Sequence, residues 1–153
     1  MTAHPTWSEL VTRTMTAAGW YEGRAISATV LHQWKLQLAS EGFSMSPAAT
    51  VALVEFGGIK VEQSGPGIDM ARVPFEFDPM LAIGESDRFA RFESASTSNL
   101  FPLGEAGEGH AFLAISDAGH VFLVADRLYP VGESVEDSIQ NLVEGRRFTP
   151  RTT

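Results

Sequence analysis

The sequence of 153 residues contains no cysteine, which excludes disulfide bonds, thiolate zinc sites and cysteine nucleophiles. It has no apolar run near the ~18 residues that span a bilayer, and its N-terminus lacks the basic start and apolar core of a signal peptide. We therefore expect a cytoplasmic location and no membrane contact. The remaining composition, with 44% apolar and 20% charged residues, is ordinary for a domain with a substantial core.

Sequence motifs for nucleotide binding and catalysis are missing as well. The Gly57-Gly58 pair is not followed by the Lys-Ser/Thr of a phosphate loop, and it ends a predicted helix instead of opening one. A helix cap followed by a turn is therefore the favoured interpretation of these glycines. No G-x-S-x-G nucleophile elbow is present, and the zinc site of a nucleic-acid deaminase cannot form without cysteine. The sequence thus predicts no catalytic residue, no cofactor and no enzyme activity.

Two histidines, His110 and His120, flank a predicted hairpin and have carboxylates near them at Glu108 and Asp117. Two histidines and a carboxylate are in principle enough to hold a metal ion. Their spacing has no helical i, i+4 pattern, however, and both lie where a turn exposes them, so we predict no metal site. An enzyme with a dispersed carboxylate or histidine site is the alternative that a deep pocket would support.

Negative charge is concentrated in the second half of the chain. The net charge is −8, with 19 acidic residues against 11 lysines and arginines. Residues 1–60 are balanced, residues 61–145 carry 15 acidic residues against four arginines for a net −11, and residues 146–153 add three arginines. Such a surface repels phosphate backbones, so we expect no direct nucleic-acid binding, and it favours a basic protein partner. Solubility alone is the competing interpretation of the same charge.

Helix start signals precede several stretches that carry apolar residues at helical spacing. They occur at residues 6–9, Ser27, Ser46-Pro47, Asp78-Pro79 and Ser134. Apolar positions such as Val51 are expected to face the core, and the three tryptophans, Trp7, Trp20 and Trp34, are expected to pack among the first helices.

Strands are predicted at residues 59–63, at residues 69–78 and three times across residues 100–126. Pro74 marks the second of these as an edge or bulged strand, and Asp117-Ala118-Gly119 is a hairpin turn signal. Because helices come first and strands follow, the order predicts an α+β fold with a mainly antiparallel or mixed sheet and helices packed around it. We expect one domain over residues 1–145 and a basic, flexible tail over residues 146–153.

Two segments together resemble one protein family. Residues 46–61 (SPAATVALVEFGGIKV) form a helix that ends in an aromatic residue and Gly-Gly before a strand, and residues 101–124 (FPLGEAGEGHAFLAISDAGHVFLV) join Phe-Pro-Leu-Gly-Glu to two strands through acidic, glycine-rich turns. Both resemble the SUKH superfamily of bacterial immunity proteins, in particular its third group, in which residues 18–21 (AGWY) and 41–43 (EGF) also look typical.

The resemblance implies a non-catalytic protein that neutralises a polymorphic toxin, often a nuclease or a nucleic-acid deaminase, by binding it. Since such toxins bind phosphates, the cognate toxin domain is expected to be basic. Our contact candidates are the acidic residues on or near the sheet turns: Glu62, Asp69, Glu76, Glu105, Glu108 and Asp117. The alternative to an immunity protein is a non-catalytic adaptor or regulatory protein-interaction module.

Overall fold

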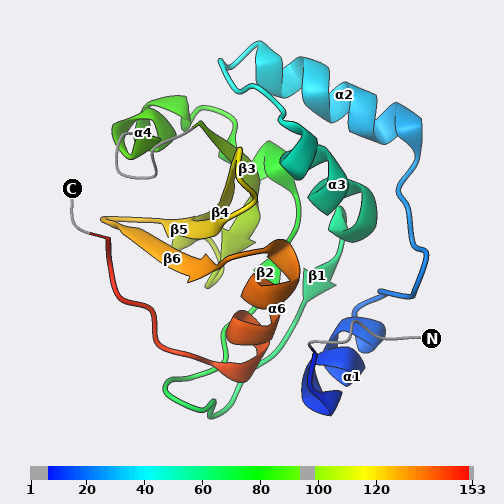
Figure 1. Cartoon of the computed structure of the whole chain (residues 1–153), viewed down its shortest axis with the longest axis vertical. Helices are drawn as coiled ribbons and strands as arrows, with labels where there is room; N and C mark the ends of the chain where they lie inside the picture. Colours follow the sequence, from blue (N-terminus) through cyan, green and yellow to red (C-terminus); the bar gives the residue numbers. More distant parts are fainter. Residues whose placement is uncertain (1–6, 94–98, 152–153) are drawn as a thin grey trace.

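Six strands form one antiparallel sheet in which each strand pairs with its neighbour in sequence, in the order β1-β2-β3-β4-β5-β6 (Figure 1). The computed structural model describes residues 7–93 and 99–151. The strands are β1 (Lys60–Val61), β2 (Phe75–Glu76), β3 (Leu100–Ala106), β4 (Ala111–Ser116), β5 (Val121–Val124) and β6 (Leu128–Gly132). The α+β prediction is confirmed, and so are the three strands expected across residues 100–126.

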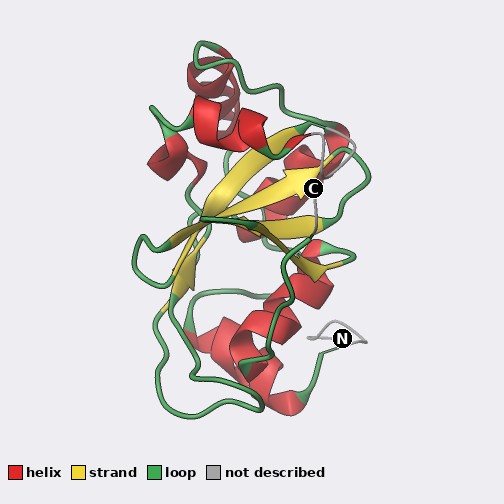
Figure 2. Cartoon of the chain, turned by 90° about the vertical axis from the view of Figure 1, so that its left-hand side faces the viewer, coloured by secondary structure: helices red, strands yellow, loops and turns green. Residues whose placement is uncertain are grey.

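Helices lie on both sides of this sheet (Figure 2). They are α1 (Glu9–Ala17), α2 (Ala28–Ala39), α3 (Pro47–Phe56), the 3-10 helix η1 (Pro79–Ala82), α4 (Ser86–Arg91) and α6 (Val135–Glu144). Helix α6 packs on β6 and α1 packs on α6. The Trp7 indole N–H donates to the Glu136 carbonyl at 2.9 Å, which fixes the start of α1 against α6.

The predicted helix caps are largely confirmed. The side chains of Ser27, Ser46 and Ser134 each accept a backbone N–H bond from the first turn of α2, α3 and α6. Helix α1 is capped by Ser8, which accepts the Val11 N–H. The capping box predicted at residues 6–9 would instead begin at Thr6, which lies outside the described residues.

Two strand predictions need correction. Only Phe75–Glu76 of the predicted strand at residues 69–78 pairs in the sheet, because Ile68, Asp69 and Met70 donate their N–H groups to the end of α6 instead. Strand β2 lies between β1 and β3, so the edge alternative inferred from Pro74 is wrong, and Pro74 itself precedes the paired residues Phe75–Glu76. Strand β6 was not predicted at all. It contains Pro130 and lies at the sheet edge, where the missing N–H is tolerated.

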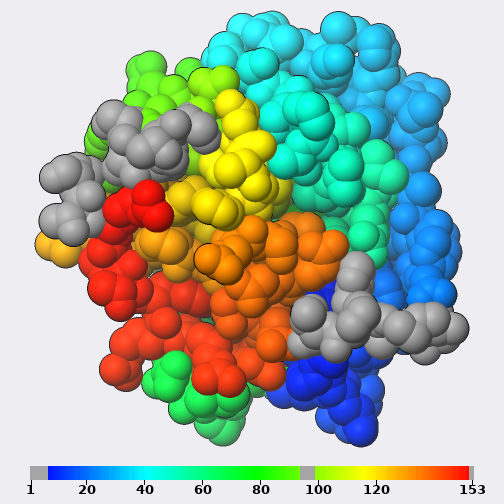
Figure 3. Space-filling model, viewed as in Figure 1, coloured from blue at the N-terminus to red at the C-terminus, as the bar shows by residue number. Residues whose placement is uncertain are grey.

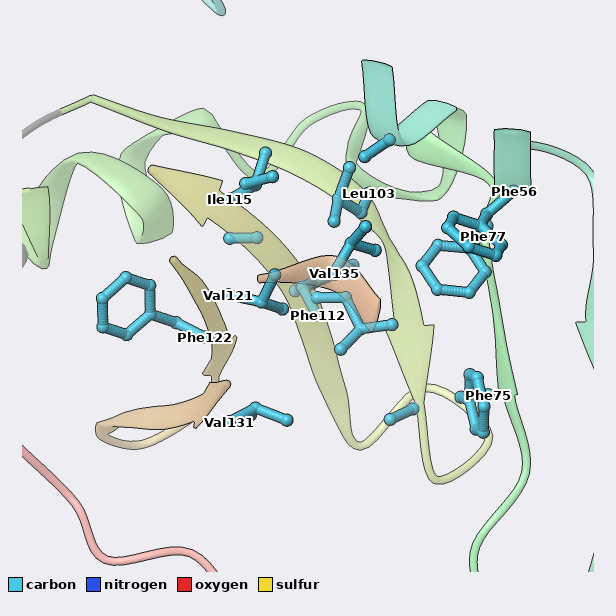
Figure 4. Close-up of a cluster of buried hydrophobic side chains, with 14 of the residues drawn as sticks. Phe56, Phe75, Phe77, Leu103, Phe112, Ile115, Val121, Phe122, Val131 and Val135 are labelled. Carbon is cyan, nitrogen blue, oxygen red and sulfur yellow. The ribbon is translucent and has the colours of Figure 1, made fainter. Parts of the chain in front are cut away.

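Aromatic side chains fill the core on the side of the sheet that α3 covers. Phe77 lies between Phe56 and Phe75, with ring centroids 5.7 and 6.0 Å away (Figure 4). Trp7 and Trp20 are buried as expected and meet edge to face, with their ring centroids 5.1 Å apart. Such a ring pair stabilises the fold beyond the burial of its apolar area. Val51, by contrast, is 67% exposed on α3 and does not face the core.

The C-terminal residues lie against the sheet as far as Arg151. Phe148 packs on the core, the Arg151 N–H donates to the Leu128 carbonyl at 2.7 Å, and the Arg151 guanidinium sits over the Phe122 ring at 5.4 Å. Within the predicted tail of residues 146–153, Phe148 and Arg151 thus contact the core and β6, whereas Arg146, Arg147 and Thr149 are exposed. Residues 152–153 lie outside the described part of the chain, and flexibility of the tail stays a prediction.

Candidate functional site

Four of the six predicted contact residues line a single open groove of about 490 Å³. They are Glu62, Glu76, Glu105 and Glu108. The groove runs over β1, β2 and β3 and reaches the turn between β3 and β4. Two cationic side chains, Lys60 and Arg72, also line it, so the lining residues carry a net −2. We call this feature the acidic groove.

Strand register places the central side chains of the acidic groove side by side. Lys60 is directly opposite Glu76, and Glu76 is directly opposite Glu105. Residues opposite each other in neighbouring strands share one face of the sheet, with Cβ atoms about 5 Å apart. The intervening residues Val61 and Phe75 are buried on the other face. The alternation that builds the core therefore also aligns a row of charges on the outside.

Gly104 allows β2 and β3 to come together at this point. A Cβ built on Gly104 would overlap the backbone carbonyl oxygen of Glu76, and the strand register shifts between Pro102 and Gly104. A bulge of this kind bends a strand and re-aims its side chains. Gly104 lies within the Phe-Pro-Leu-Gly-Glu segment. The structural role of this segment is to position Glu105 beside Glu76.

Glu108 occupies a costly backbone conformation at the end of the groove. Its φ is 56°, and among the described residues it is the one non-glycine residue with positive φ. A left-handed conformation costs an L-residue about 1–2 kcal/mol. Strain of this kind is often found at functional sites, and here it holds a carboxylate at the rim of the groove.

The groove carboxylates have few partners within the protein. No hydrogen bond and no ion pair joins any of the four to another side chain of residues 7–93 or 99–151. Like charges directly opposite each other in a sheet are destabilising, and Glu76 and Glu105 are such a pair. In the unbound protein these carboxylates are therefore open to solvent, with a net negative charge that a cationic partner would neutralise.

The other two contact candidates lie elsewhere. Asp69 is in the loop between β1 and β2, where its carboxylate accepts the Arg147 backbone N–H at 3.0 Å. Asp117 is exposed in the turn between β4 and β5. The charge pattern alone did not separate these two from the groove residues, and it also missed Lys60 and Arg72. The alternation of residues 59–63 contained the signal for Lys60, since it places that side chain beside Glu62.

The two histidines do not form a site with each other. His110 precedes β4 and His120 follows it, so about 20 Å of extended strand separates them. Across residues 7–93 and 99–151, no group of three or more His, Cys, Asp or Glu side chains is arranged to hold a metal ion. In the same residues, no helix is long and apolar enough to cross a membrane.

The fold and the groove together define an α+β domain that presents a solvent-open acidic surface. The family model described as SUKH-3 immunity protein matches residues 7–145. The chain therefore belongs to the SUKH-3 immunity protein family, which confirms the resemblance seen in the sequence. No curated protein and no solved structure matches the chain.

Proposed function

We propose that this immunity protein binds a basic toxin domain of the nuclease or nucleic-acid deaminase class and neutralises it sterically, with the acidic groove as the contact surface. The observation that carries the proposal is the gathering of Glu62, Glu76, Glu105 and Glu108 on one face. We further propose that it acts in the cytoplasm, without catalysis and without contacting nucleic acid or membrane.

The chemistry of the groove suits a protein surface better than a small molecule. Pockets for small ligands are mostly apolar and enclose the ligand, whereas six of the side chains that line this groove are charged. A nuclease or deaminase holds the phosphates of its substrate with lysine and arginine. Carboxylates on adjacent strands can pair with those same lysines and arginines. When the immunity protein covers these cations, the substrate of the toxin is excluded.

Charge also sets the kinetics that an immunity protein needs. A complementary field raises association rates by orders of magnitude at low ionic strength. The net charge of −8 supplies such a field over the whole protein, with 15 of the 19 acidic residues in residues 61–145. Inhibition by this route requires fast capture of the toxin and no chemical step.

The test is co-expression and binding with each toxin domain encoded beside the gene. One variant neutralises three groove residues (Glu76→Gln, Glu105→Gln, Glu108→Gln), and a control removes the same charge from exposed positions elsewhere (Asp87→Asn, Asp126→Asn, Glu133→Gln). We expect the groove variant to lose protection and to weaken binding at least ~10-fold, while the control stays within about threefold. Equal losses of affinity in the groove variant and the control would show that only the net charge matters. If none of the toxin domains encoded beside the gene binds the protein, the proposed function is refuted.

A further inference from the structure

Two large apolar side chains are exposed at the tip of the loop between β1 and β2. Ile68 is 57% exposed and Met70 is 43% exposed. The loop lies against the end of α6 and the residues that follow it, at the surface of the molecule (Figure 3). Single exposed apolar residues are common, so the question is whether this pair is presented by an ordered structure.

Backbone hydrogen bonds fix the loop. Within it, the Gly67 N–H donates to the Met70 carbonyl at 2.9 Å. The Ile68 N–H donates to the Glu144 carbonyl at 2.8 Å, and the Met70 N–H donates to the Gly145 carbonyl at 3.0 Å. The loop thus satisfies carbonyl groups that the end of α6 would otherwise leave open.

Close packing and side chains add to this anchoring. A Cβ on Gly67 would collide with the backbone of Met70, Glu144 and Gly145, so the loop and the helix end meet without intervening side chains. The Arg72 guanidinium donates to the Val143 carbonyl and to the Gln63 side chain, both at 2.8 Å. The conformation that displays Ile68 and Met70 is therefore already formed in the unbound protein.

The anchored loop is continuous with the acidic groove. Ser64 and Arg72, at the two ends of the loop, both line the groove. Interfaces typically combine a few ordered apolar anchors, methionine among them, with a charged surround. Preorganised anchors also avoid the entropy cost of ordering on binding.

We infer that Ile68 and Met70 are the apolar anchor of the toxin interface, seated in an apolar pocket beside the basic surface of the cognate toxin domain. This inference rests on the proposed function. A second copy of this chain is the less suitable occupant, because each copy has a net charge of −8 and would bring its own acidic groove toward the other.

The experiment measures the affinity of the toxin domain encoded beside the gene for Ile68→Ala, Met70→Ala and the double variant. Leu36→Ala and Val51→Ala are matched controls, since these residues are 58% and 67% exposed on α2 and α3. We expect the double variant to weaken binding roughly 30-fold or more, with thermal stability unchanged and the controls within about threefold. Protection of the Ile68 and Met70 amides from hydrogen exchange should also increase on complex formation.

The outcomes separate the anchor from the groove. If wild type binds and the double variant binds within about threefold of it, the anchor is refuted while the proposed function stands. If the double variant loses binding while the groove variant retains it, the anchor stands and the groove assignment fails. If the unbound wild-type protein self-associates and the double variant does not, these residues belong to a dimer interface and the inference is overturned. The inference is also overturned if no toxin domain encoded beside the gene binds the wild-type protein.

Discussion

Replacing Glu105 by glutamine should make the unbound protein more stable and its complex weaker. Glu105 is directly opposite Glu76, and Glu76 is opposite Lys60 on its other side. The substitution therefore removes the like-charge pair and leaves the Lys60–Glu76 neighbours in place. A cross-strand charge pair contributes about 0.2–1 kcal/mol, which for a chain of this length corresponds to a rise in Tm of roughly 0.4–4 °C.

Thermal unfolding at low and high salt measures this effect. The gain should shrink in about 1 M salt, where the screening length falls to about 3 Å. Glu133→Gln is the matched control, because it removes one exposed carboxylate outside the groove and should not stabilise. In a titration with the toxin domain, Glu105→Gln should weaken binding roughly 10-fold. A lower Tm for Glu105→Gln, or a gain that is independent of salt, would show that Glu76 and Glu105 do not repel each other in the folded protein.

Substitutions at three positions test other parts of the site, each by denaturant unfolding. Glu108→Asn should stabilise the unbound protein by about 0.5–1 kcal/mol, because asparagine tolerates the left-handed conformation. Glu108→Ala keeps the conformational cost and should not stabilise the protein. Equal effects of the two substitutions would contradict backbone strain at φ 56°. Gly104→Ala should cost about 3 kcal/mol or more by forcing β2 and β3 apart, and a near-neutral result would contradict the close approach. Arg72→Ala should lower the free energy of unfolding by about 1.5–3 kcal/mol, because it removes the hydrogen bonds to Val143 and Gln63. Arg72→Lys should restore only part of this stability, since an ammonium group lacks the planar fork of the guanidinium. Full restoration by lysine would show that the positive charge alone is sufficient.

Local chemistry explains why most elements could be predicted from the sequence. Ser27, Ser46 and Ser134 bond to the first turn that follows each of them, so the signal and the structure lie within a few residues. The hairpin at residues 111–124 has its turn residues between two apolar runs in the same way. Such contacts need no knowledge of the rest of the fold.

Contacts between distant residues explain the errors. The segment before β2 was predicted as a strand, but it forms a loop because its N–H groups bond to Glu144 and Gly145, more than 70 positions away in the sequence. The acidic groove was predicted only as a set of scattered carboxylates. Its assembly depends on the register that places Glu76 between Lys60 and Glu105, and no local pattern encodes that register. Glu108 was predicted as a contact residue, but its left-handed conformation was not, since glutamate is not a residue type that marks positive φ.

The most direct measurement is an experimental structure of this protein bound to the toxin domain encoded beside its gene. We predict lysine or arginine side chains of the toxin within ion-pair distance of Glu76 and Glu105, with the substrate-binding surface of the toxin covered. A toxin bound over α2 and α3, with the acidic groove left open to solvent, would show that the groove is not the toxin-binding surface.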